Sequence, residues 1–304
     1  MPFRCSHAVG YAGWIKDKES GLMIPVRSCN LVKTPGKIFG DDLIHGSSGD
    51  EAATPIYWAW GANAYGGSIN TYFMTALWDG LLKDWCLEDR CTPRSLIVSP
   101  DGVEVHEYVD CYVTSFRLAS TAPTGAGGTP VDLSFDIAAR TRVVSTETSA
   151  SYNATGPADL DNAPVPYWRT SMSYDGFNSA SVTPAVTSWS LTVRHNTFSI
   201  YVHDGQQDPG WIKQGLVIVE GECVLYHPDG VPEPVDSITE ANHTPYSLTI
   251  TIAKQGDVTF TTFTIPYVVI TEYSKPFAGT SAPVVRTVRF RGMGDATTPA
   301  ISIT

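Results

Sequence analysis

The side chains that could do chemistry are scattered along the chain, and few fall into the spacings that chemistry requires. The seven histidines form none of the HxH, HxxxH or HExxH patterns that bring two imidazoles to one metal ion. His203 in YVHDG and His227 in YHPDG stand near an aspartate, which would suit a catalytic His–Asp pair. Asp-Gly is first a turn signal, however, so a turn is the simpler interpretation of both motifs.

Three further motifs resemble known sites but lack a decisive part. GSSGD is not the GxSxG of a nucleophile elbow, and GAGGT lacks the Lys-Ser/Thr of a phosphate loop. DGQQD offers fewer oxygen ligands than calcium requires. Cys86 and Cys91 could form a disulfide or half of a metal site, although six cysteines are too few for a disulfide scaffold. The sequence therefore predicts no catalytic, cofactor-binding or metal-binding residue and no enzyme.

An aromatic cluster and an arginine-rich strand are the strongest candidates for binding. Tyr57, Trp58 and Trp60 lie in PIYWAWGANAYGG, where aromatics beside glycines could anchor a loop into a neighbouring subunit. They could also pack on the chain's own core or form a sugar-binding platform. Arg286 and Arg289 lie in RTVRFR, which suits a solvated face or intersubunit salt bridges, with phosphate binding as a further alternative.

The composition excludes several classes of protein. The chain has 304 residues, of which 42% are hydrophobic and 17% charged, so it can bury a core. Its formal net charge of -11 makes it a poor binder of nucleic acid or anionic membrane. It could still line a passage through which nucleic acid slides. No window has the roughly 18 apolar residues of a membrane helix, and we expect a soluble protein without a membrane anchor.

The patterns predict one helix and many strands. The spacing of apolar residues predicts a helix over 68–89 with Ser68 as its cap, and alternation predicts strands after it. HNT at 195–197 is expected to form a turn, and Pro266 to mark an edge or a bulge. We expect an N-terminal arm and long loop over 1–67, belonging to a first domain that continues over 68–150. A connector over 151–165 and a second domain over 166–304 follow.

An internal similarity suggests a duplication. VDLSFDIAAR (131–140) and YSLTITIAKQ (246–255) both alternate and both reach Ile-Ala at the same offset. Each follows a strand that contains a cysteine, Cys111 or Cys223, at a similar distance. We therefore expect two copies of one unit, with these two strands at the same structural position.

The second half resembles a known family. The order of TSWSLTVRHNTFSIYV, GLVIVEGECVLYHPDG, YSLTITIA and FTIPYVVITEYSKPFAGTSAPVVRTVRFRGMGD is similar to the C-terminal half of phage tail tube proteins. The helix near Leu77 and YVDCYVTSFRLAS resemble the first half of such proteins. The resemblance implies a mainly β protein with two tail-tube-type β-sandwich or barrel domains, at least one flanking α-helix and long loop or arm segments.

The resemblance also implies a function. It indicates the major tail tube subunit of a long non-contractile, siphovirus-type tail, which forms trimeric rings that stack into the conduit for genome ejection. Its implied partners are further copies of itself and the tail terminator, tape-measure and distal tail proteins. Genomic DNA would pass through the lumen without specific binding. The protein would be assembled in the host cytoplasm and located in the virion tail.

Particular residues are assigned to this assembly. Thr124, Gly125 and Gly127, in the loop 121–130, are candidate inter-ring contacts, as are the aromatic cluster and the two arginines. Asp132 and Asp136 are candidate lumen acids, where we expect Ser247 and Thr251 at the matching positions of the second unit. The alternatives are another virion β-protein, such as a tail terminator or capsid decoration protein, and a carbohydrate-binding β module.

Overall fold

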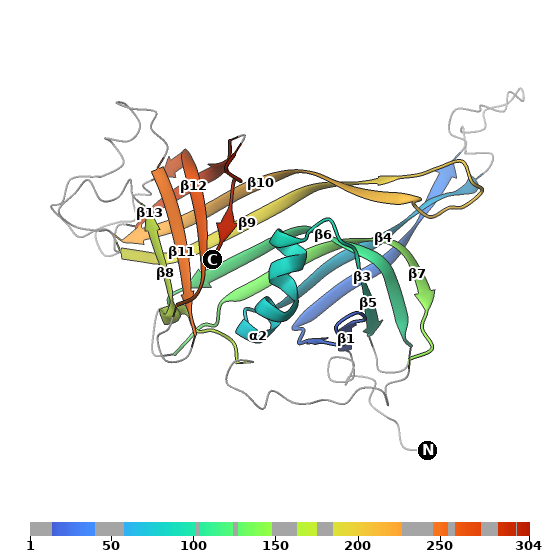
Figure 1. Ribbon diagram of the computed structural model, residues 1–304, viewed down its shortest axis with the longest axis horizontal. Helices are drawn as coiled ribbons and strands as arrows, with labels where there is room; N and C mark the ends of the chain where they lie inside the picture. The colour runs from blue at the N-terminus through green and yellow to red at the C-terminus, as the bar shows by residue number, and fades with distance from the viewer. Residues whose placement is uncertain are drawn as a thin grey trace, which may run out of the picture.

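The computed structural model describes residues 14–39, 58–100, 104–123, 127–147, 163–174, 185–226, 246–254, 259–274, 285–295 and 297–304 (Figure 1). The expected mainly β class is confirmed. The strands of the first half are β1 (Trp14–Asp17), β2 (Met23–Ile24), β3 (Ser28–Phe39), β4 (Trp58–Tyr72), β5 (Arg94–Ser99), β6 (His106–Thr121) and β7 (Asp132–Val144). Those of the second half are β8 (Thr170–Tyr174), β9 (Ala185–Ile200), β10 (Trp211–Tyr226), β11 (Tyr246–Ala253), β12 (Thr259–Ser274), β13 (Val285–Met293) and β14 (Ser302–Ile303), preceded by the short 3-10 turn η6 (Tyr167–Arg169).

The alternation in the sequence becomes alternation of burial. Leu133, Phe135 and Ile137 of β7 point into the core, while the alternate residues Asp132 and Asp136 are exposed. β6 and β7 form the expected antiparallel hairpin across the loop 121–130. Pro266 lies at a shift in the register between β11 and β12, so the expected bulge is confirmed.

The helix begins later than its apolar spacing predicted. α2 (Thr75–Leu77) continues as the π-helical turns η2 (Trp78–Leu82) and η3 (Asp84–Glu88), and its N-cap is Met74. The prediction that Ser68 caps a helix is wrong, because Ser68 lies inside β4 and pairs with Asn30 and Asp136. Ile69, Thr71 and Phe73 are all buried, which is the two-residue period of a strand.

Two other local expectations are corrected. The segment HNT forms no turn, because β9 runs without interruption through His195 and pairs there with β10. The described part of the N-terminal segment is not only loop: β3 and β4 form a long antiparallel hairpin, and β4 pairs with β7. The alternation of apolar and polar residues is weak in β3 and β4. The reason is that β3 is largely exposed and that β4 contains Gly66 and Gly67 at positive φ.

The two halves repeat one topology. In the first half the strands are paired in the order β1–β5–β6–β7–β4–β3. In the second half they are paired in the order β8–β11–β12–β13–β10–β9. Every pair is antiparallel, and the two orders match strand for strand. We call residues 14–147 the first repeat and residues 163–304 the second repeat.

The repeat corrects the pairing expected from local similarity. VDLSFDIAAR is β7, whose counterpart is β13, whereas YSLTITIA is β11, whose counterpart is β5. Ser247 and Thr251 are therefore not the positions that match Asp132 and Asp136. The exposed positions of β13 hold Arg289 and Arg291.

The two repeats are joined through one strand pair and one core. Ser115–Thr121 of β6 pair antiparallel with Ser188–Arg194 of β9. On the inner side, α2 and its continuation cross the junction (Figure 1). The fully buried Trp78 contacts Phe116 of β6 and Phe263 of β12, with ring centroids 5.9 and 5.4 Å apart. The halves thus share one hydrophobic core.

Candidate assembly interface

Among the described strands, β12 and β3 each have an open edge at the two ends of the path β3–β4–β7–β6–β9–β10–β13–β12. On one edge of β6, His106–Cys111 pair with β5 and Ser115–Thr121 pair with β9. On the matching edge of β12, β11 pairs with residues as far as Val268, and no described strand continues along this edge at 269–274, which pair with β13 on their other edge. An unpaired edge carries N–H and C=O groups that are ready to bind another strand. The missing partner of β12 is the counterpart of β9, which is β3.

β3 is the complementary edge. It pairs with β4 on one side, and no described strand lies on its other side. Its counterpart β9 buries Trp189, Leu191 and Val193, whereas Ser28–Asn30 and Val32–Pro35 of β3 are exposed. The exposure of β3 is therefore that of a strand with no second strand paired along its outer edge.

One face of the joined sheet is polar. Eight strands, in the order β3–β4–β7–β6–β9–β10–β13–β12, form a continuous path, and the side chains opposite the core are mostly charged or hydroxylated. On this face Asp136 accepts a hydrogen bond from Ser115 at 2.6 Å, and Asp132 pairs with Arg27. Arg289 contacts Glu222 at 2.7 Å and Glu272 at 2.5 Å. The acids of this face are thus largely balanced by arginines within the described residues.

The tip of the β9–β10 hairpin docks onto the first repeat. Asp208 accepts hydrogen bonds from Asn63 Nδ2 at 2.9 Å, Tyr65 Oη at 2.7 Å and Thr141 Oγ1 at 2.6 Å. The backbone N–H of Asn63 donates to the carbonyl of Gln207 at 2.8 Å. Tyr201 Oη donates to the carbonyl of Asn63 at 2.7 Å. β4 and β7 of one repeat are thereby fastened to the hairpin of the other.

The electrostatics of this contact follow from its geometry. Burial alone would raise the pKa of Asp208, but the hydrogen bonds from Thr141, Tyr65 and Asn63 stabilise the carboxylate and bring the pKa below its ordinary value. Burial and the hydrogen bond to Asp208 raise the pKa of Tyr65 to about 12. The contact is therefore strongest with Asp208 ionised and Tyr65 protonated.

Sequence reasoning missed this cluster. DGQQD, which ends at Asp208, stood out only as a poor cation site. Its hydrogen-bond partners lie 67 to 145 residues away in the chain, and no local pattern reports such a distance.

The residues selected from sequence lie in different places. Tyr57, Thr124 and Gly125 fall outside the described residues. Trp58 and Trp60 belong to β4, where they pair with Phe39 and Lys37, but their side chains are outside the described part. Gly127 has φ 147° and open space around its Cα. Arg286 is buried, and Arg289 is exposed on the polar face.

No catalytic or metal-binding constellation emerges from the described part of the chain. Cys86 is a buried free thiol and Cys91 an exposed one. Among the described residues no group of three or more His, Cys, Asp or Glu side chains could hold a metal ion. The described part of the chain instead offers open strand edges, which carry N–H and C=O groups that can bind another strand.

Comparison with known proteins decides the family. The family described as phage tail tube protein matches residues 46–292, which include most of both repeats. The chain belongs to the phage tail tube protein family. No curated protein gives a significant match. Membership confirms the resemblance drawn from the strand order, and it makes the protein a structural component of the virion tail.

Family membership gives the interfaces a context. The family implies assembly of the protein into a tube. In the segments that the structure describes, no helix has the length and apolarity needed to cross a membrane.

Proposed function

We propose that this tail tube protein is the major tube subunit and that three copies close into a ring through β3 and β12. The open edge of β12 at 269–274 would pair with β3 of the next copy, as β6 pairs with β9 inside the chain. The single observation that carries the proposal is this repeated topology with one junction made and one left open. A junction that links two repeats in one chain also suits two repeats in neighbouring chains.

The number of three copies follows from the resemblance to tube proteins with two fused tube domains, whose trimeric rings mimic sixfold symmetry. Each chain supplies two repeats and an eight-stranded path, so three chains supply six repeats and a barrel of about 24 strands. Closure of the ring removes every open edge of the path. The ring would be sixfold in shape and threefold in sequence.

The polar face would line the lumen. Ion pairs such as those of Arg289 occupy arginines that could otherwise hold DNA phosphates. Asp136, whose hydrogen bond comes from the neutral Ser115, would repel the phosphates. The first repeat would present Asp132 and Asp136 on β7 where the second presents Arg289 and Arg291 on β13. We expect genomic DNA to pass through without specific binding when it is ejected.

Stacking of rings would use the loop between β6 and β7. The described part of this loop is tied at its base, because Val131 N–H donates to the carbonyl of Val165 and Tyr167 N–H to that of Thr129, at 2.8 and 2.9 Å. Residues 124–127 lie beyond these bonds. Their replacement by a short turn should leave soluble rings that do not polymerise, and tubes of normal length would contradict this role.

The tube would be one part of a complete tail. A protein with two tube repeats suits a long non-contractile tail, where the tube would meet the tail terminator at one end and the distal tail protein at the other. The tape-measure protein would occupy the lumen until ejection. Assembly would take place in the host cytoplasm.

Electron microscopy and native mass spectrometry of the purified protein test the proposal. We expect rings and open tubes in images of concentrated protein, and a dominant ring mass of three chains. Monomers at every concentration would overturn the proposal, and would favour a terminator or decoration protein. Monomers that bind glycans would favour a carbohydrate-binding module.

A further inference from the structure

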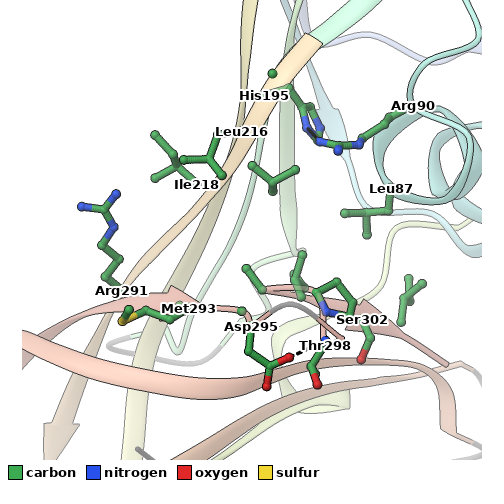
Figure 2. A pocket seen from close by; sticks show the side chains of 18 of the residues that line it. Leu87, Arg90, His195, Leu216, Ile218, Arg291, Met293, Asp295, Thr298 and Ser302 are labelled. Carbon is green, nitrogen blue, oxygen red and sulfur yellow. Dashed lines mark hydrogen bonds between the residues drawn. The ribbon is translucent and has the colours of Figure 1, made fainter.

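A pocket of about 920 Å³ lies in the second repeat (Figure 2). Its walls are Gly215–Ile218 of β10, Arg291–Met293 of β13 and the C-terminal segment. Leu87 and Arg90, at the end of η3 and just after it, close another side together with His195. Leu216 is 70% exposed at its border and Met293 is 51% exposed, so large apolar side chains face solvent there.

The first repeat shows what occupies the matching place. The pocket lies at the N-terminal half of β10 and the C-terminal end of β13, whose counterparts are β4 and β7. At the same places on β4 and β7 lie Asn63, Tyr65 and Thr141, which hold the tip of the β9–β10 hairpin through Asp208. The pocket is therefore the counterpart of a hairpin-binding site.

The hairpin that would fill it is the counterpart of β9–β10, which is β3–β4. This hairpin cannot come from the same chain, because it extends to the end of the molecule opposite β12 and β13 (Figure 1). We propose that the pocket binds the β3–β4 hairpin of a second copy, through residues 40–57. This inference rests on the proposed ring, in which β3 of the next copy lies along β12.

The chemistry of the two partners is complementary. Residues 40–57 contain the apolar pair Leu43 and Ile44, for which Leu216, Ile218 and Met293 offer contacts. The segment also contains four acids, Asp41, Asp42, Asp50 and Glu51. The pocket lining includes two arginines, Arg90 on its inner side and Arg291 at its border. In the first repeat, an acid of the hairpin tip likewise makes the contact.

The acids of the pocket leave this complementarity intact. Asp295 accepts hydrogen bonds from the backbone N–H groups of Thr297 and Thr298, both at 2.7 Å. These bonds stabilise its carboxylate and lower its pKa to about 2. Glu88 is paired with Lys83 at 3.1 Å. The two acids of the pocket lining thus already have partners, and Arg90 and Arg291 belong to the same lining.

Photo-crosslinking in the full-length assembled protein tests the inference. A photoreactive phenylalanine analogue replaces Leu216, tubes are assembled from a mixture of isotopically labelled and unlabelled protein, and crosslinked peptides are identified by mass spectrometry. We expect mixed-isotope crosslinks between position 216 and residues 40–57. The same analogue at Val144, which is 79% exposed at the end of β7, is the matched control and should not crosslink to that segment.

The outcomes separate this inference from the proposed function. Tubes whose position 216 crosslinks to the loop 121–130, to another protein segment or to nothing would overturn the pocket assignment while the tube role stands. A protein that forms no rings would overturn both. As an independent measure, Leu216→Glu should stay folded by circular dichroism yet remain monomeric at a concentration that fully assembles the wild type. Rings formed by this variant as readily as by the wild type would contradict the inference.

Discussion

Replacing Asp208 by asparagine should release the tip of the β9–β10 hairpin from the first repeat. The substitution removes the charge that accepts three hydrogen bonds, at 2.6 to 2.9 Å, from Asn63, Tyr65 and Thr141. Hydrogen bonds to a charged group contribute about 1.5–3 kcal/mol each when they are shielded from water. Because Asp208 is only half-buried and asparagine keeps one acceptor oxygen, we expect a total loss of about 2–3 kcal/mol.

The backbone amide of Asn63 reports this release directly, because it donates to Gln207 in the docked tip. A loss of about 2–3 kcal/mol corresponds to hydrogen exchange roughly 30 to 150 times faster at this amide. Asp204→Asn is the control: Asp204 accepts a bond only from the neighbouring Gln206 N–H among the described contacts, at 2.9 Å. It should change the exchange of Asn63 by no more than about threefold.

The pH dependence gives a second measure of the same contact. The lowered pKa of Asp208 means that its contribution is present above about pH 4 and is lost as the pH falls through the folded-state value. The raised pKa of Tyr65 means that its contribution is present below about pH 10 and is lost as the pH rises toward about 12. Exchange at Asn63 that is unchanged in Asp208→Asn, or equally fast in both variants, would refute the docking role.

Three further predictions concern the fold. Trp78→Ala should lower the free energy of unfolding by about 3–5 kcal/mol in urea titrations, because the fully buried ring lies between Phe116 and Phe263; a loss below about 1 kcal/mol would contradict its bridging role. Gly221→Ala should lower the free energy of unfolding by about 1–3 kcal/mol, because the new Cβ would lie 2.2 Å from Phe290 Cζ. Gly80→Ala, whose Cβ would meet only Leu22 at 3.9 Å, should raise it by up to about 1 kcal/mol. Equal effects of the two substitutions would refute the packing account. Burial and the nearby Arg90 lower the pKa of His195 to about 4. The free energy of unfolding of the wild type should therefore decrease as the pH is lowered from 6.5 to about 4. His195→Gln should flatten that part of the pH profile.

Local patterns predicted the strands but not their partners. The alternation in β6 and β7, the loop between them and the bulge at Pro266 follow from short-range sterics and burial. Ser68 was mistaken for a cap because Phe73, Leu77 and Leu81 continue the spacing of an apolar helix face, although β4 extends to Tyr72. Ile69, Thr71 and Phe73 are spaced two residues apart, as in a strand, so this stretch of sequence fits both a helix and a strand.

Long-range pairing explains the other differences. β7 and β11 look alike because both alternate, yet their places in the sheet depend on neighbours far away in sequence. β7 lies between β6 and β4, while β11 lies between β12 and β8. The duplication itself was visible in the sequence, but its correct alignment required the pairing order. The docking site of Asp208 likewise depends on contacts between repeats.

Electron cryomicroscopy of the assembled tube, at a resolution that separates strands, tests the central claim most directly. We predict three chains in each ring, with β3 of each chain antiparallel to residues 269–274 of β12 in the next, so that this contact repeats the internal pairing of β9 with β6. Six chains in a ring, or rings closed by other elements in which β3 does not pair with residues 269–274 of β12, would contradict the account.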